Sequence, residues 1–217
     1  MTPDTERTPA AGASRPLISV KASAPLAIAA ITALLRDLLA NGIIRVAGAA
    51  QLGDVHVTVL PPDRVTLGSE EPNQLNLFLY RVEPQVALPA PARRGADARR
   101  DIGLKLHYLV TAYSSQDYHA ELLLGCALNL FGTIPVLTAD AARAVLHAKA
   151  QRGSRGPRSP VRDALAACDV LETAERIVLT QQFLSLEDTG KLWSMLQARY
   201  RPSVTYEVSA VRMSVDD

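Results

Sequence analysis

Hydroxyl, carboxylate and imidazole groups gather in one short segment of the chain, residues 114–119. Ser114, Ser115, Asp117 and His119 supply every side-chain type of a serine hydrolase triad. A working triad needs these groups to converge from separate elements, and the sequence lacks the GxSxG turn that exposes a nucleophile. Helix capping accounts for the same residues, because Ser115 can cap a helix and Asp117 suits its first turn. We therefore predict a helix start here and no enzyme activity.

The histidines and cysteines do not follow a metal-binding pattern. The four histidines include no HExxH motif and no pair at helical ligand spacing. Cys126 and Cys168 lack CxxC spacing and stand among apolar residues, which indicates reduced core thiols. Glycine-rich phosphate loops are also absent from the sequence. No metal and no cofactor is expected.

Arginines concentrate in two segments without an apolar pattern, residues 84–101 and 150–161. Proline, glycine and serine are frequent in both, which predicts solvated loops. Together the loops could hold an acidic or phosphate-bearing partner, although few aromatic residues interleave them, which disfavours nucleic acid. A small non-enzymatic binding module is therefore the alternative function. The arginines concerned are Arg93, Arg94, Arg99, Arg100, Arg152, Arg155, Arg158 and Arg162.

Length and charge limit the class of protein. The chain has 217 residues, of which 48% are hydrophobic, enough for one complete core. Its 23 Lys and Arg balance 22 Asp and Glu, so no overall field attracts nucleic acid or an anionic membrane. We predict a flexible tail over residues 1–20 and one domain over residues 21–217. The apolar segment Leu26–Leu35 is shorter than a bilayer span, so no membrane span is expected.

Helical periodicity and helix-ending residues predict four helices. The first can start from Ser23 and stop at Asn41-Gly42. The last opens with a capping box, Ser185 to Asp188, and contains Trp193, the only tryptophan, which we expect in the core. The predicted helices cover residues 25–40, 115–132, 139–149 and 185–196.

Strict alternation of apolar and polar residues predicts strands. The predicted strands cover residues 54–60, 74–82, 104–113, 176–180 and 203–214. Strands and helices interleave and no segment repeats at a fixed period, which predicts a single α/β (α+β) domain with helices packed on one mixed sheet. The strand at 203–214 contains no proline, and two positions remain open for it: an edge that accepts another chain, or the interior of the sheet.

Three blocks of this pattern resemble the tail-cap (tail terminator) proteins of extracellular contractile injection systems, the Pvc16-like N-terminal domain family. The blocks are Pro72–Val82, Leu104–Tyr113, and Leu192–Leu196 followed by Tyr200–Tyr206. They occur in the family's order, and the likeness extends over about residues 24–213. The residues that carry it are Asn76, Phe78, Tyr80, Arg81, His107, Tyr108, Trp193, Tyr200, Arg201, Pro202 and Tyr206.

The resemblance implies a structural role. A protein of this family is expected to form a hexameric ring with copies of itself and to end the inner tube and sheath at the far end of the particle. It would be assembled in a bacterial cytoplasm and incorporated in the particle. Two features depart from the family pattern: the chain ends after the shared domain, and the basic segment Gln151–Pro160 matches no block.

Overall fold

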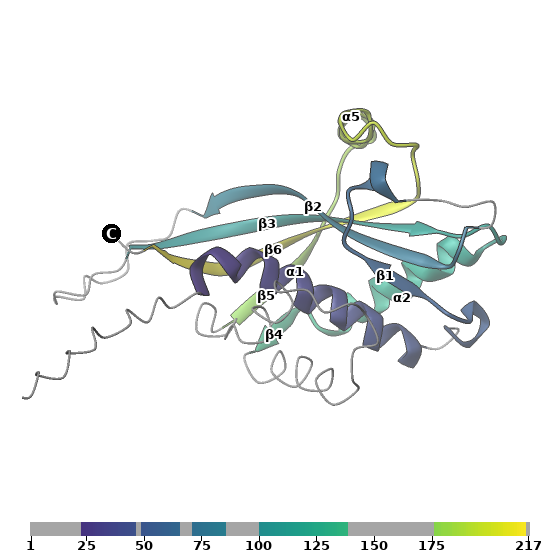
Figure 1. Ribbon diagram of the computed structural model, residues 1–217, viewed down its shortest axis with the longest axis horizontal. Helices are drawn as coiled ribbons and strands as arrows, with labels where there is room; N and C mark the ends of the chain where they lie inside the picture. The colour runs from purple at the N-terminus through teal and green to yellow at the C-terminus, as the bar shows by residue number, and fades with distance from the viewer. Residues whose placement is uncertain (1–22, 47–48, 66–70, 86–99, 139–175, 216–217) are drawn as a thin grey trace, which may run out of the picture.

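Six strands form one mixed sheet in the order β1-β2-β3-β6-β5-β4 within the residues that the structure describes (Figure 1). The structure is a computed structural model, and it describes residues 23–46, 49–65, 71–85, 100–138 and 176–215. The strands are β1 His56–Thr58, β2 Gln74–Gln85, β3 Arg100–Tyr113, β4 Val136–Thr138, β5 Arg176–Gln182 and β6 Ser203–Val215. The α-helices are α1 Ser23–Gly42, α2 His119–Thr133 and α5 Leu186–Met195. Three short 3-10 helices are η1 Ile43–Arg45, η2 Ala49–Leu52 and η3 Pro62–Arg64.

The three longest strands, β2, β3 and β6, make the body of the sheet. β3 lies antiparallel to both neighbours, β5 pairs with β6, and only β1 runs parallel to its partner β2. The register shifts between Leu79 and Arg81 of β2, so Tyr80 is an extra residue in that strand. A second shift lies opposite Leu104 and Leu106 of β3, where β6 has the extra residue. Such bulges bend a strand and increase its twist.

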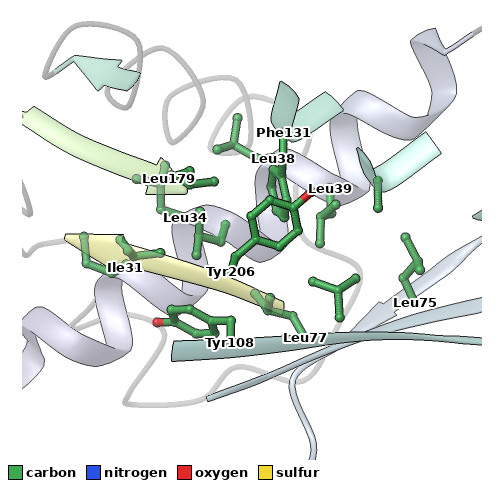
Figure 2. Close-up of a cluster of buried hydrophobic side chains, with 14 of the residues drawn as sticks. Ile31, Leu34, Leu38, Leu39, Leu75, Leu77, Tyr108, Phe131, Leu179 and Tyr206 are labelled. Atoms are coloured by element: carbon green, nitrogen blue, oxygen red, sulfur yellow. The ribbon is translucent and has the colours of Figure 1, made fainter. Parts of the chain in front are cut away.

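One face of the sheet is buried under α1 and α2. Leu75 and Leu77 of β2, Leu106 and Tyr108 of β3, and Val208 of β6 are almost completely buried on that face. Figure 2 shows Ile31, Leu34, Leu38 and Leu39 of α1 meeting these strands, with Phe131 of α2 against Tyr206. The rings of Phe131 and Tyr206 meet edge to face, with their centroids 4.9 Å apart. This layer is the main hydrophobic core.

A hydrogen bond between two hydroxyl groups crosses this core from α1 to β3. The hydroxyls of Thr32 and Tyr108 lie 2.8 Å apart, and Thr32 Oγ1 donates to the carbonyl of Ile28 at 3.0 Å. With its own proton committed to Ile28, Thr32 accepts from Tyr108. Burial raises the pKa of Tyr108, which therefore stays neutral and able to donate. The contact fixes the position of α1 along the strand.

The segment Leu26–Arg45 is long and apolar enough to cross a bilayer by length and composition. In this fold 56% of that segment is buried inside the protein. Its buried residues face the sheet and belong to the core cluster. Asp37 is also buried and pairs with the guanidinium of Arg36. The segment has the burial of a core helix.

The opposite face of the sheet carries α5, in the connection between β5 and β6 (Figure 1). Ser185 caps this helix by accepting from the backbone N–H of Asp188 at 3.0 Å, as the capping box predicts. Leu192 and Trp193 of the helix bury themselves against Leu109 of β3 and form a second, smaller core. The predicted core position of Trp193 is confirmed.

Most predicted elements are confirmed, and the fold class with them. The strand predicted at 54–60 is shorter, covering only His56–Thr58, whereas β2 and β3 are longer than predicted. β6 is internal, because β3 and β5 pair with its two sides, so the edge position considered for it is wrong. The helix predicted at 139–149 and the basic segment 150–161 lie outside the described residues.

The start of α2 is a correction. The helix begins at His119, and its N-cap is Tyr118, whose side chain makes no cap hydrogen bond. Tyr118 has φ 67°, a left-handed conformation that costs a bulky residue energy. Ser115 does not cap the helix; its hydroxyl donates to the carbonyl of Glu71 at 3.2 Å. Sequence spacing cannot distinguish a cap from a turn that ties down a distant segment.

Replacing Trp193 with alanine tests the second core. Because Trp193 is only 4% exposed, Trp193→Ala should lower the free energy of unfolding by about 3–5 kcal/mol. Urea denaturation followed by far-UV circular dichroism measures the change. Phe183→Ala, at an aromatic side chain that is 86% exposed, is the matched control and should leave the midpoint almost unchanged. Equal effects of the two substitutions would contradict this core.

Candidate functional site

The residues of the signature blocks meet at the end of the sheet where β2 and β6 begin and β3 ends. Arg201 donates to both carboxylate oxygens of Glu71, at 3.1 Å and 2.6 Å. The same guanidinium lies 5.7 Å from the ring centroid of Tyr113. Burial raises the pKa of Tyr113 to about 12, with Arg201 lowering it and Glu71 raising it by smaller amounts. This cluster joins three chain segments far apart in sequence.

Asn73 is the centre of a second polar cluster at this end. Its side-chain N–H donates to the carbonyl of Leu52, and its own carbonyl accepts from the backbone N–H of His56 at 2.9 Å. Its side-chain oxygen accepts from the hydroxyl of Ser114 at 2.8 Å and lies 3.1 Å from Nδ1 of His119. An amide oxygen only accepts, so Nδ1 of His119 carries the proton.

These contacts decide how the hydrolase-like segment is used. Ser114 and His119 are both directed at Asn73, and Ser115 is directed at the backbone of Glu71. Asp117 is exposed on the surface, and the described contact of His119 Nδ1 is with Asn73. A nucleophile–base–acid arrangement is therefore not formed by these residues. They fasten the β3–α2 turn to the start of β2.

Asn76, three residues further along the chain in β2, also ties separate segments together through its side-chain amide. Its side chain is completely buried, accepts from Thr58 Oγ1 and the N–H of Leu60, and donates to the carbonyl of Leu60. The side-chain amide of Asn76 thus bonds to both backbone groups of Leu60, as the backbone of a paired strand would. It holds Leu60 just where Pro61 and Pro62 turn the chain away from β2.

Charged and aromatic signature residues lie on the face of the sheet that carries α5. Lys105 and Glu207 are 3.0 Å apart, Nε2 of His107 is 3.4 Å from Glu83, and Arg81 also pairs with Glu83. The ring of Tyr80 lies 6.0 Å from that of His107. Burial is the main cause that raises the pKa of Tyr80. Opposite charges on neighbouring strands therefore neutralise each other on this face.

The remaining signature residues are structural as well. Tyr108 and Tyr206 lie in the main core, and Phe78 is half-buried on the opposite face. Pro202 accepts a backbone bond from Ala112 where β6 starts. Tyr200 meets the ring of Trp193 edge to face at 5.7 Å, although 63% of it is exposed. In the structure, each residue of this set is at least partly buried or makes a packing or polar contact.

Large apolar side chains are exposed at both ends of α5, and sequence reasoning missed them. They are Phe183, Leu186, Met195 and Tyr200. Leu186 is 87% exposed and Met195 is 75% exposed. Exposed aromatic and Met side chains of this kind are enriched at protein interfaces. The available signal was a helix with apolar residues on more than one face.

The arginine segments do not contribute to any site that can be described. Seven of the eight arginines lie outside the described residues; the eighth, Arg100, is the first residue of β3, and its side chain is not described. Among the described side chains, no group of three His, Cys, Asp or Glu residues is placed to hold a metal ion.

The family model of the Pvc16 N-terminal domain matches residues 30–217. The chain belongs to this family. The match includes every signature block and all of the described sheet. The resemblance seen in the sequence is thus confirmed for the Pvc16 N-terminal domain. No curated protein sequence matches the chain.

Two solved structures share the fold of this Pvc16 N-terminal domain. One is the sheath/tube terminator of the extracellular contractile injection system PVC in its extended state, with 20% identity and a TM-score of 0.50. The other is the tube-terminating cap of the anti-feeding prophage, AFP, with 18% identity and a TM-score of 0.50. Each match covers 88% of this chain. The chain corresponds to only 56% and 54% of those two proteins.

The Arg201–Glu71 pair provides a test of the signature cluster. A double-mutant cycle with Arg201→Met and Glu71→Gln should give a coupling energy of about 1.5–3 kcal/mol, because both partners are largely buried and make two charge-assisted bonds. Chemical denaturation of the four proteins measures it.

The control cycle uses Lys191 and Glu187, an exposed pair on α5. Its coupling should be about 0.3–0.5 kcal/mol, as is usual for exposed helix pairs. Equal coupling energies in the two cycles would show that the Arg201–Glu71 contact does not anchor the cluster.

Proposed function

We propose that this chain is a cap subunit, or tail terminator, of a contractile injection particle. In this role it closes the far end of the inner tube and sheath as a hexameric ring of identical copies. The observation that carries the proposal is the combination of family membership with a fold shared with two terminators over 88% of the chain. Kinship at this level supports the role, and the ring size rests on the family resemblance.

The exposed apolar residues of the surface support a role in contacts between subunits. A closed ring needs two different patches on each subunit, one that meets the preceding copy and one that meets the next. The exposed apolar residues at the two ends of α5 are suited to such contacts. The signature polar groups, by contrast, bond to one another inside the protein, where they stiffen it. A rigid subunit with an apolar contact surface can act through its shape.

The partners in this role are other copies of the chain and the sheath and tube proteins of its particle. Assembly in the bacterial cytoplasm precedes incorporation in the particle. The proposal concerns the terminator domain alone, since the two solved terminators are almost twice as long as the matched region. The alternative of an Arg-rich binding module has no support from the described residues.

Deleting the gene from its own particle cluster tests the proposal. Electron microscopy should then show sheaths and tubes of uncontrolled length with one open end, because nothing stops polymerisation there. Supplying the chain from a plasmid should restore capped particles of uniform length. Gold labelling of a tagged chain should mark one end of each particle.

Two variants of α5 are compared in the deletion strain to control for a general defect in particle assembly. Trp193→Ala, which weakens the second core, should behave like the deletion, whereas Glu187→Gln on the exposed side of α5 should restore normal particles. Uniform, capped particles in the deletion strain would refute the proposed function.

A further inference from the structure

Within the part of the chain that the structure describes, the outer edge of β2 is only partly paired. β1 pairs with Gln74, Leu75 and Asn76, and no described strand pairs with that side of β2 from Leu77 to Val82. The two prolines after Leu60 turn the β1 chain away, and the Asn76 amide holds it there. The backbone donors and acceptors of a strand edge are a template for another strand.

Side chains along this open edge show what kind of strand would fit. After the bulge at Tyr80, Val82 pairs with Leu106 and so faces the same side as the main core. Val82 is 44% exposed and Leu79 is partly exposed, whereas Leu75 and Leu77, which precede them on this face, are buried. An added strand with apolar residues on the helix-covered side would complete the core at this margin.

The chain itself contains such a sequence, immediately before α1. Between Pro16 and Ser23 it reads Leu-Ile-Ser-Val-Lys-Ala. In a strand, Ile18 and Val20 would lie on one side, with Leu17, Ser19 and Lys21 on the other. Two β-branched apolar residues on one side match the exposed margin at Leu79 and Val82. These residues lie outside the described part of the chain.

Geometry indicates that this sequence reaches a neighbour's edge and not its own. α1 begins at the end of the sheet where β2 stops, and runs towards β1 at the other end (Figure 1). Among the strands, α1 contacts β6 most and β1 next. Because β1 lies at the far end of the helix (Figure 1), we infer that the beginning of α1 is nearest to β6. A strand added to β2 would lie three spacings from β6, about 14 Å away, and one layer off, about 10 Å. From Val20 to Ser23 the chain spans at most about 11 Å.

We propose that residues 17–20 of one copy add as a strand to the open edge of β2, Leu77–Val82, in a second copy of this chain. Each copy then gives one strand and receives one, which is a heterologous contact that closes into a ring. The inference rests on the proposed function for its ring, and it names the contact that links neighbouring subunits. Main-chain bonds supply the affinity and Ile18 and Val20 supply the register.

A peptide experiment tests the contact directly. The probe is a fluorescein-labelled peptide of residues 15–23, titrated into the full chain carrying Ile18→Lys and Val20→Lys so that its own segment cannot compete. Fluorescence anisotropy should show saturable binding. Val82→Lys in the receiving chain should weaken binding by about tenfold or more, because it places a charge at the apolar margin. Ile44→Lys, at an exposed position away from this edge, should have no effect.

Oligomeric state tests the link between copies. The mass of the full chain, measured by light scattering, should fall to that of a monomer with Ile18→Lys/Val20→Lys. It should be unchanged by the equally charged control Ala10→Lys/Ala13→Lys. Circular dichroism checks that both variants are folded.

The outcomes separate this inference from the proposed function. Rings that persist in Ile18→Lys/Val20→Lys, or a peptide that fails to bind, overturn the strand exchange and leave the cap role standing. A peptide that binds to a chain whose unmodified form is monomeric supports the edge contact and counts against the ring. A lower unfolding midpoint in Ile18→Lys/Val20→Lys without a change in mass would place the strand within its own copy and overturn the proposal.

Discussion

Burial of one face of β2, β3 and β6 under α1 is the constraint on which the rest of the structure depends. Alternate residues of the strands face the helix, so the residues between them must all face the other way. That second face receives Leu109, which contacts α5, together with the ion pair of Lys105 and Glu207 and the neighbouring side chains of His107 and Glu83. The Thr32–Tyr108 hydrogen bond sets the position of α1 on this layer. Once the core face is fixed, the character of the opposite face follows from the sequence.

Local patterns predicted the elements well, because their causes are local. The cap at Ser185 and the alternation in β2, β3 and β6 depend on neighbouring residues, and all are present as predicted. The order of strands could not be predicted, since pairing depends on contacts between distant segments, and β6 proved to be central. β4 was missed because three residues, Val136–Thr138, are too few to show a period. The start of α2 was misplaced because Ser115 bonds to Glu71, which lies 44 positions away.

At the candidate site, too, the residues could be identified from the sequence, whereas their contacts with distant segments could not. A resemblance to the family identified the signature residues, yet their tasks became visible only in three dimensions. Arg201 and Glu71 are 130 positions apart, and Asn73 gathers partners from three other segments. Three of the signature residues, Asn76, Arg201 and Pro202, make contacts that hold this end of the sheet together. The exposed apolar residues at the two ends of α5 had no comparable sequence signal, because exposure is a property of the folded surface and not of a period.

The extra residue at Tyr80 exchanges the two sides of β2 for everything that follows it. Before it, even-numbered residues such as Phe78 point away from α1; after it, odd-numbered residues such as Arg81 and Glu83 do so. If β2 kept all its residues but ran on without this bulge, Arg81 would pair with Leu106 and Glu83 with Leu104, and both charged side chains would turn into the apolar layer while every pairing up to Leu79 stayed correct. The irregular backbone at Tyr80 is thus what keeps these two charges out of the core, and the strand could regain a regular ladder with the same facing only by losing one residue there.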